Sequence, residues 1–271
     1  MAESEPRENL QVHHDQGVCT IVFDRPNKKN AFTQAMYRGL VAALDQAAAD
    51  PATRVVLLHG AGGVFTAGND LHDFATNPPI GKAAERDESG LPRHPLLRLL
   101  HLLPRFEKPL VAAVQGPAVG IGVTMLLHCD LIYAGEGARF SLPFVNLGLS
   151  PEAGSSLLLP RVMGHPRAAE LLMLAEPFTA ATALHFGLIN QVLADEVVID
   201  RARSIAQTLA RKPAASLRAT KQLMRAPIAA QLQQVIDREV EVFSQRLVSP
   251  EAREAFEAFL SKREPNFGKF E

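Results

Sequence analysis

Short apolar runs bounded by turn residues recur through roughly the first two thirds of the chain. Branched and other apolar residues dominate these runs, which is typical of short strands in a buried sheet. The runs are Val18–Phe23, Arg54–Gly60, Leu110–Val114, Asp130–Ala134 and Ala138–Ser141. We therefore predict an α/β protein with repeated strand, strand and helix units from about residue 10 to about residue 190.

Helical periodicity separates these predicted strands. In Gln34–Ala49 the apolar residues fall on one face, and Thr33 is placed to cap the N-terminus. Leu96–Leu103 has the pattern of a second apolar helix. Residues 75–95, in contrast, are rich in proline, glycine and charge and have no period, which is typical of a functional cover or a mobile loop.

The pattern changes after Asn190 to nearly continuous helix. The predicted helices are Glu196–Arg211, Pro213–Met224, Ile228–Leu247 and Pro250–Ser261. They carry apolar residues that a lone tail could not bury, among them Leu217, Leu223, Ile236, Phe243 and Leu247. We predict that residues 1–190 form an α/β core, and that the helices of residues 191–271 dock onto another subunit or back onto this core.

Composition and charge exclude several classes of function. Hydrophobic residues make up 47% of the 271 residues, enough for a large core, and the formal net charge of −1 disfavours nucleic acid as a partner. The longest apolar stretch, Leu110–Cys129, is interrupted by a glutamine, a proline and glycines, so we expect no membrane span. Cys19 and Cys129 lack the spacing of metal ligands, so we expect no metal site.

We recognise no targeting signal at either end of the sequence. The first residues are polar and acidic, unlike a secretory signal or a transit peptide, and the last three, Lys-Phe-Glu, are unlike a peroxisomal signal. Two separated cysteines suit a reducing compartment. We therefore expect a cytoplasmic protein.

Two glycine-rich turns are candidates for chemistry. Val64–Leu71 and Pro117–Thr124 each follow a predicted strand and precede a helical pattern, so each places backbone N–H groups where they can hold a developing negative oxygen. Asp70 in the first turn fits an N-cap for the next helix. The second turn is weak evidence for nucleotide binding, because it lacks the third glycine and the acidic residue of the dinucleotide fingerprint.

Glu152 is the only acidic residue between Phe140 and Arg161, and apolar residues flank it on both sides. Ser150-Pro151-Glu152 has the form of a helix start, with an N-cap, a proline and an acid that the macrodipole favours. The alternative is a catalytic base. Apolar neighbours would raise the pKa of this carboxyl and a helix N-terminus would lower it, and the sequence leaves that balance open.

Five segments resemble, in order and over nearly the whole chain, the crotonase or enoyl-CoA hydratase/isomerase superfamily. They are Asn27–Ala31, Ala67–Leu71, Lys108–Gly120, Cys129–Ala134 and Ala138–Phe140. The resemblance implies a crotonase-like spiral of ββα turns followed by a C-terminal helical trimerisation region. It also implies a homotrimer or a dimer of trimers, an acyl-CoA thioester as substrate, and no cofactor, because coenzyme A is part of the substrate.

Two departures narrow the resemblance to one branch of the superfamily. Hydratases of this family use two glutamates, and the corresponding positions here hold Thr124 and Phe144, neither of which can activate water. Leu147–Ser156 instead resembles the segment of the peroxisomal-type Δ3,Δ2-enoyl-CoA isomerases, whose single glutamate matches Glu152.

The resemblance therefore implies an isomerase that converts 3-enoyl-CoA to trans-2-enoyl-CoA. Glu152 would carry the proton from C2 to C4, and the backbone N–H groups of Asn69 and Ile121 would hold the oxygen of the dienolate. The acyl pocket would be drawn from residues 72–103. The residues implied in substrate binding are Ala67, Gly68, Asn69, Asp70, Leu71 and Phe144.

Other functions remain open at this point. The same turns would serve another CoA-thioester reaction, such as hydration, thioester hydrolysis or dehalogenation, and the CoA pocket could persist in a binding module without catalysis. Arg25, Lys28 and Lys29 either meet the phosphates of CoA or form a solvated cationic loop. The sequence leaves open the length and branching of the acyl group.

Overall fold

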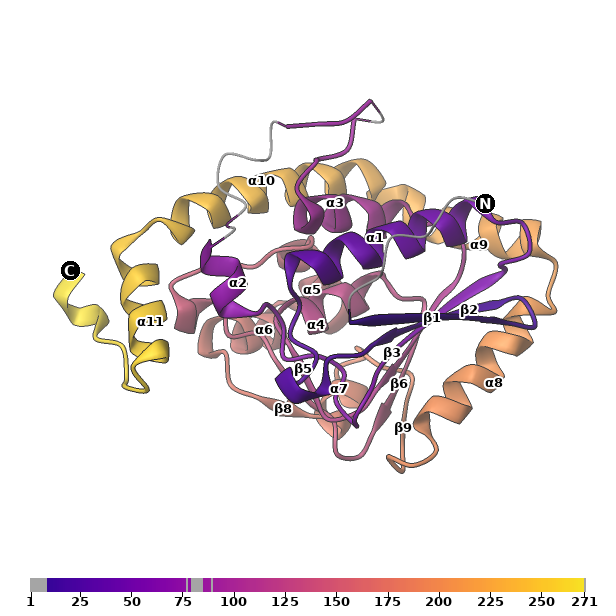
Figure 1. Cartoon of the computed structure of the whole chain (residues 1–271), viewed down its shortest axis with the longest axis horizontal. Coiled ribbons are helices and arrows are strands. Elements are labelled where there is room, and N and C mark those ends of the chain that lie inside the picture. Colours follow the sequence, from indigo (N-terminus) through magenta and orange to yellow (C-terminus); the bar gives the residue numbers. More distant parts are fainter. Residues whose placement is uncertain (1–8, 77, 79–84, 89, 271) are drawn as a thin grey trace.

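A six-stranded sheet forms the centre of the computed structural model, which describes residues 9–76, 78, 85–88 and 90–270 (Figure 1). Its strand order is β1-β2-β3-β4-β6-β9, and a second sheet has the order β5-β7-β8. The strands of the large sheet are β1 (Leu10–Asp15), β2 (Val18–Phe23), β3 (Val55–Gly60), β4 (Leu110–Val114), β6 (Leu131–Gly135) and β9 (Gln191–Leu193). Those of the small sheet are β5 (Pro117–Val119), β7 (Arg139–Ser141) and β8 (Phe178–Thr179).

The chain winds between the two sheets as a spiral. β1 pairs with β2 as an antiparallel hairpin, and β2, β3, β4, β6 and β9 then follow one another in parallel. After β4 and β6 the chain crosses to the small sheet, where it forms β5 and β7. After β3 it also reaches the small sheet, but Thr66 forms only an isolated parallel bridge there, to Ala118 of β5. The predicted α/β spiral of strand, strand and helix is confirmed.

Helices cover both faces of the large sheet (Figure 1). On one face α1 (Gln34–Ala49) and α3 (Pro95–Leu102) share a core with Ile21 and Phe23, and on the other α8 (Val198–Ala210) packs over the alternate strand residues. Because successive side chains of a strand point to opposite faces, a continuous apolar run contributes side chains to the cores on both faces of the sheet.

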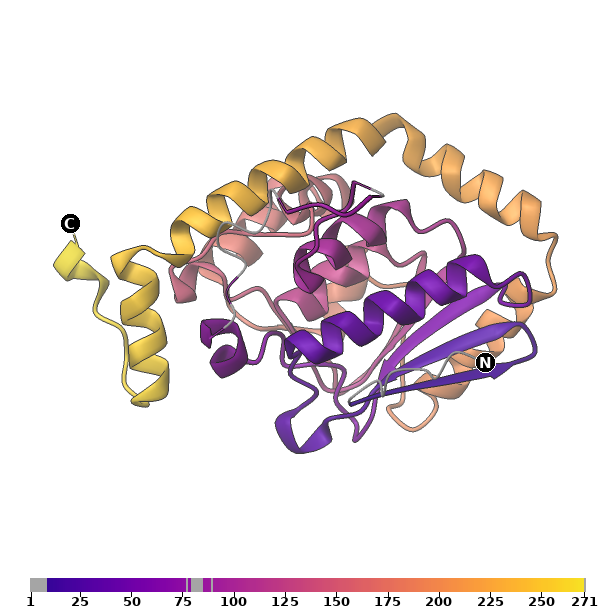
Figure 2. The same ribbon diagram turned by 45° about the horizontal axis from the view of Figure 1, so that its top comes forward.

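Three further helices complete the C-terminal region: α9 (Ala214–Arg225), α10 (Ala229–Leu247) and α11 (Pro250–Leu260). In Figure 2, α10 passes over the body of the molecule and α11 stands at the end opposite the N-terminus. α10 buries Ile236 and Phe243 against the core of its own chain, so for these two residues the second predicted alternative, docking back onto the core, is confirmed. Leu223 on α9 remains 74% exposed. The division at residue 190 stays a prediction.

The remaining helices lie in the connections between strands. They are α2 (Leu71–Thr76), α4 (Ile121–Thr124), α5 (Ser155–Met163), α6 (His165–Ala169) and α7 (Ala180–His185). Among them, α2 and α4 contribute to the site. Of the patternless segment at 75–95, residues 77, 79–84 and 89 lie outside the described residues. Within the described ranges, no helix has both the length and the apolar character needed to cross a bilayer.

Local signals predicted most boundaries well but failed at Glu152. The helix predicted at Gln34 begins there, and the hydroxyl oxygen of Thr33 accepts the Met36 N–H at 3.2 Å. The helix start predicted at Ser150-Pro151-Glu152 is wrong, because α5 begins only at Ser155. Gly154 is its N-cap, in the left-handed conformation at φ 75°. A carboxylate from α10 occupies the free N–H groups at this helix start, as described below.

Candidate functional site

Backbone hydrogen bonds join the two glycine-rich turns. The Thr66 N–H donates to the carbonyl of Pro117 at 3.0 Å, and the Val119 N–H donates to the carbonyl of Thr66 at 3.1 Å. A Cβ atom on Gly68 would lie 2.8 Å from the Val119 carbonyl oxygen, and Gly68 has φ +84°. This close approach requires glycine at position 68 and brings the two turns to one place.

The backbone N–H groups of Asn69 and Ile121 are free to bind a ligand. Phe32 pairs with the residues on either side of Asn69, accepting from Asp70 N–H at 2.9 Å and donating to the Gly68 carbonyl at 2.7 Å, so the N–H of Asn69 itself points away from Phe32. Ile121 is the first residue of α4, where N–H groups have no intrahelical partner. No described residue accepts from either group, and both residues line one cavity. The two donors can together hold a negative oxygen.

Side chains from distant segments hold the first turn in place. The Tyr37 hydroxyl on α1 donates to Asn69 Oδ1 at 2.5 Å, and burial raises the pKa of this phenol well above its ordinary value, so it remains a donor. The fully buried Asn30 donates its amide to the carbonyls of Ala61 and Val64, at 2.9 and 2.6 Å. The turn is therefore anchored on both sides before any ligand binds.

Asp70 caps α2, as the sequence predicted. Its Oδ1 accepts the N–H groups of His72 and Asp73, each at 3.1 Å, and its Oδ2 pairs with the Arg25 guanidinium at 2.7 Å. Hydrogen bonds, chiefly from Arg25, lower the pKa of Asp70 against the opposing effect of its burial. Arg25 is thus engaged within the protein, whereas Lys28 borders the large cavity.

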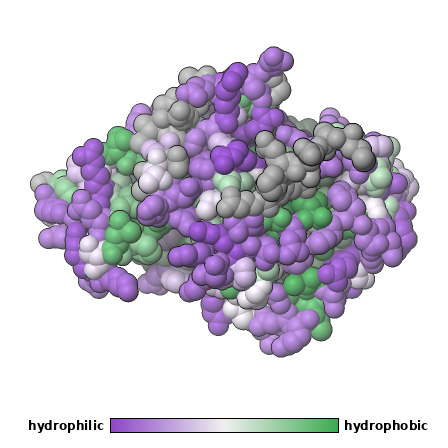
Figure 3. All heavy atoms as spheres, in the orientation of Figure 1, coloured by the Kyte–Doolittle hydropathy of each residue, from purple (hydrophilic) through white to green (hydrophobic). Residues whose placement is uncertain are grey.

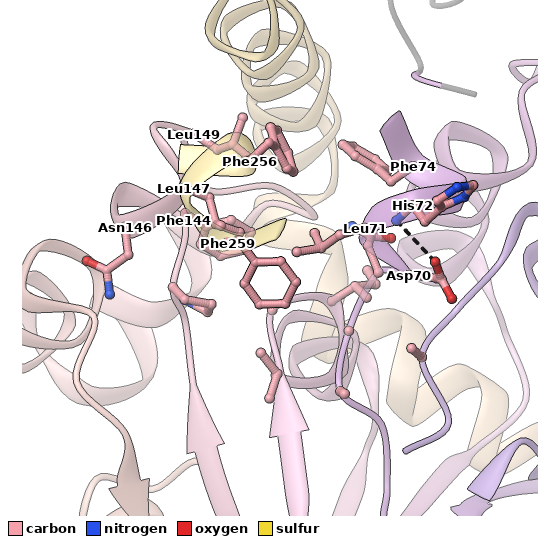
Figure 4. Close-up of a pocket in the computed structure, with 18 of the residues that line it drawn as sticks. Asp70, Leu71, His72, Phe74, Phe144, Asn146, Leu147, Leu149, Phe256 and Phe259 are labelled. Atoms are coloured by element: carbon pink, nitrogen blue, oxygen red, sulfur yellow. Dashed lines mark hydrogen bonds between the residues drawn. The ribbon is translucent and has the colours of Figure 1, made fainter. Parts of the chain in front are cut away.

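A cavity of about 640 Å³ lies between the first turn, Phe144 and α11 (Figure 4). The predicted substrate-binding residues all line it, namely Ala67, Gly68, Asn69, Asp70, Leu71 and Phe144, and so does Ile121. Phe256 and Phe259 of α11 form the facing wall, which the sequence did not indicate. Figure 3 shows that apolar surface also gathers on the side of the molecule where α11 lies.

In the described ranges no three His, Cys, Asp or Glu side chains are placed to hold a metal ion.

Glu152 lies beside this cavity, at the end of a narrow second one. Its side chain is only 6% exposed and comes from the loop that precedes α5. The narrow cavity shares Asn69 and Phe243 with the large one, and the rest of its lining is Glu152, Leu96, Leu97, Leu100, Val240 and Ser244. The large cavity alone does not reach the carboxyl group. The reacting part of a ligand would therefore sit where the two cavities meet, next to Asn69.

The two oxygens of Glu152 have different surroundings. The Thr124 hydroxyl on α4 donates to Oε1 at 2.5 Å, whereas Oε2 is buried and has no partner among the described residues. Buried carboxylate oxygens normally find a donor, so an unpaired one beside a cavity is the feature expected of a group that acts on a ligand. Thr124, which the sequence comparison treated only as a missing acid, orients this carboxyl group.

Burial decides the protonation of Glu152. It raises the pKa of the carboxyl to about 8, which outweighs the lowering effect of the Thr124 hydrogen bond, and the charge of Glu239 raises the pKa further. The helix start that would have lowered the pKa is not available to it. Glu239 on α10 takes the Gly154 and Ser156 N–H groups there, at 2.5 and 2.9 Å.

Sequence reasoning missed Tyr37, Thr124 and Glu239 because each acts through a contact between distant segments. One signal was present for Glu239. It falls in the apolar stripe of α10 formed by Ile236, Val240 and Phe243, where a charged residue is unusual unless it has partners.

Comparison with known proteins agrees with this geometry. The chain matches the enoyl-CoA hydratase/isomerase family model over residues 13–269. It is 37% identical to 1,2-epoxyphenylacetyl-CoA isomerase of Escherichia coli, over 96% of this chain and 98% of that protein. It is 34% identical to enoyl-CoA delta isomerase 2 of Rattus norvegicus, over 96% of this chain and 66% of that protein. Other relatives at 33% and 35% identity are named as a hydratase and a dehalogenase.

The fold is shared as well. The crystal structure of an enoyl-CoA hydratase/isomerase from Pseudoalteromonas atlantica superposes with a TM-score of 0.87 at 38% identity, covering 96% of this chain and all of that one. The predicted crotonase-like fold is confirmed by this match. On its sequence, its fold and the paired turns of its site, the chain belongs to the enoyl-CoA hydratase/isomerase family.

Proposed function

We propose that this protein is a Δ3,Δ2-enoyl-CoA isomerase, which moves the double bond of a 3-enoyl-CoA thioester to the trans-2 position. The observation that carries the proposal is the single buried carboxyl of Glu152, with one oxygen held by Thr124 and the other unpaired at the narrow cavity. One carboxyl group is what a proton shuttle between two carbon atoms needs.

The first step would remove a proton from C2 of the substrate. Glu152 Oε2 takes this proton and becomes a neutral acid, and the electron pair of the C2–H bond moves into the thioester to form a dienolate. The negative charge passes from the carboxylate to the thioester oxygen, where the N–H groups of Asn69 and Ile121 stabilise it. Each such donor is typically worth about 10²–10³ in rate.

The second step would return the same proton to C4. The carbon–carbon double bond then lies between C2 and C3, the thioester carbonyl reforms, and Glu152 is a carboxylate again. A raised pKa makes this carboxylate a stronger base towards a weakly acidic C–H bond. The Thr124 hydroxyl keeps Oε1 occupied, so that Oε2 is the oxygen that reacts.

Hydration fits the site less well. Adding water requires a second acid–base group, but position 144 is occupied by a phenylalanine in the wall of the large cavity, and Thr124 is engaged with Glu152. Among the described residues that line the narrow cavity, Glu152 is the only titratable one. We therefore favour an internal proton transfer over the addition of water.

A panel of acyl-CoA substrates tests this proposal. We expect turnover of 3-enoyl-CoA to exceed hydration of crotonyl-CoA by about 10²-fold or more, because a missing acid–base group costs about that factor. The panel should include 1,2-epoxyphenylacetyl-CoA and a 4-chlorobenzoyl-CoA, the substrates named for two relatives. Comparable rates on crotonyl-CoA and its 3-enoyl isomer would contradict the assignment, and no turnover of any member would favour a binding module.

Glu152→Gln should lower the isomerase rate by about 10²–10⁴-fold, because glutamine keeps the size and the Thr124 hydrogen bond but cannot take a proton. Binding of a CoA ester, measured by calorimetry, should change by no more than a few-fold. Glu136→Gln, at an exposed position on the loop after β6, is the matched control and should behave as wild type. An active Glu152→Gln enzyme would mean that the base lies elsewhere.

The stability of the protein should depend on pH through Glu152. With a pKa near 8 in the folded chain and near 4.5 when exposed, the folded state holds one more proton between these values, so wild-type stability falls as pH rises from about 4.5 to about 8 and levels off above that. Glu152→Gln lacks this dependence. The melting temperature of Glu152→Gln minus that of wild type should therefore increase between about pH 5.5 and about pH 9. Each unit of pKa shift corresponds to about 1.4 kcal/mol of unfolding free energy. A constant difference across this range would contradict the raised pKa.

We also propose that the protein is a homotrimer or a dimer of trimers. Leu223 and Met224 of α9, and Met173 and Leu174 beyond α6, are 60–74% exposed, which is a large apolar area for a monomer. Light scattering at micromolar concentration should give three or six times the 29.4 kDa mass of one chain. A monomer mass would contradict this prediction. In that case charged substitutions at Leu223 and Met224, which would disrupt an apolar interface, would leave the measured mass unchanged.

A further inference from the structure

We propose that Glu239 of α10 is a positioning residue that holds the loop of the catalytic base and strengthens the base by its negative charge. This inference deepens the proposed function and rests on it for the role of Glu152. Nothing in the local sequence around Glu152 points to α10, because the two residues are 87 positions apart by number and meet only in the fold.

The loop after Glu152 has an unfavourable backbone conformation that needs support. Ala153 and Gly154 are consecutive residues with positive φ, 61° and 75°, and for alanine the left-handed region is disfavoured. Ala153 is completely buried, and its carbonyl accepts a hydrogen bond from His128 at 2.8 Å. Burial lowers the pKa of His128 to about 4, so this ring is neutral and contributes no charge.

Glu239 supplies the other support. Its Oε2 accepts the Gly154 N–H at 2.5 Å, and its Oε1 accepts both the N–H and the hydroxyl of Ser156, at 2.9 and 2.5 Å. The carboxyl group is 7% exposed, and both of its oxygens act as acceptors, which is the hydrogen bonding of an ionised carboxylate. Burial raises the pKa of Glu239, and the hydrogen bonds from Ser156 and Gly154 oppose that rise. The hydrogen bonding therefore places an ionised carboxylate beside Gly154, the N-cap of α5, two residues after Glu152 in the chain.

This charge acts on Glu152. The groups that face Glu152 are the hydroxyl of Thr124 on α4, the phenol of Tyr37 on α1 and the carboxylate of Glu239 on α10. Of these three, Glu239 is the one whose hydrogen bonds are those of an ionised group. Two neighbouring carboxylates disfavour each other's ionised form, and Glu239 has three donors while Glu152 has one, so the proton resides on Glu152.

The same helix also lines both cavities, through Phe243. Val240, Phe243 and Ser244 of α10 line the narrow cavity beside Glu152, and Glu239 precedes them on the helix. One rigid element thus sets the distance between the wall of the acyl site and the base. Reacting atoms need to be placed within a fraction of an ångström, so a firm link between wall and base has a direct effect on rate.

A titration of Glu152 without substrate tests the charge effect. Full-length protein with ¹³C-labelled glutamate carboxyls gives a Glu152 signal, assigned by its absence in Glu152→Gln. We expect its midpoint to fall by about one pH unit in Glu239→Gln, because a like charge is removed. Glu241→Gln is the matched control, since this residue lies on the same helix but is 61% exposed, and its midpoint should equal that of wild type. An unchanged midpoint in Glu239→Gln would overturn the proposal.

Kinetics test the positioning effect. Glu239→Asp keeps the charge but shortens the reach to Gly154 and Ser156, so the midpoint of the kcat/KM profile should stay while its plateau at high pH falls about tenfold or more. A wild-type plateau would overturn the positioning role, and this variant also serves if Glu239→Gln does not fold. Absence of isomerase activity in the wild type would refute the proposed function, and the titration would still decide the inference about Glu239.

Discussion

The site depends on keeping one carboxyl group away from water. Burial among apolar side chains raises the pKa of Glu152 to about 8, against the lowering effect of the hydrogen bond from Thr124. Burying a carboxyl group without full pairing costs folding free energy, and the group avoids part of that cost by staying protonated. A carboxyl group with a raised pKa is the kind of group that enzymes use as an acid or a base.

The backbone around this group is arranged to accept the opposite charge. The two glycine turns are joined by the hydrogen bonds of Thr66, and they leave two N–H groups unpaired at the cavity, from Asn69 and Ile121. These donors are fixed before a ligand arrives, because Asn30 and Tyr37 already hold the first turn. Among the described residues, Glu152 Oε2 has no donor and the two N–H groups have no acceptor, which suits a ligand that develops negative charge between them.

The C-terminal helices belong to the site as well as to the surface. α8 covers one face of the large sheet, α10 supplies Glu239 and the wall residue Phe243, and α11 closes the large cavity with Phe256 and Phe259. The helices after residue 190 therefore line the two cavities, in addition to any part that they take in assembly.

The sequence by itself determined the elements of the spiral and the turns. The strand at Val18–Phe23, the helix at Gln34–Ala49 and the cap at Asp70 follow from local periodicity and from side chains that bond their own neighbours, so each can be derived from a short stretch of chain. The cavity-lining positions from Ala67 to Leu71 also follow from the sequence, through its resemblance to a family.

Tertiary structure alone decided the state of Glu152. Its local sequence predicted a helix start, which would have lowered its pKa, but Glu239 from α10 takes the N–H groups at that helix end and leaves Glu152 buried beside the cavity. Thr124 and Tyr37 likewise act across long separations in the chain. Hydrogen bonds between distant segments depend on how the helices and sheets pack, and no local pattern records that packing.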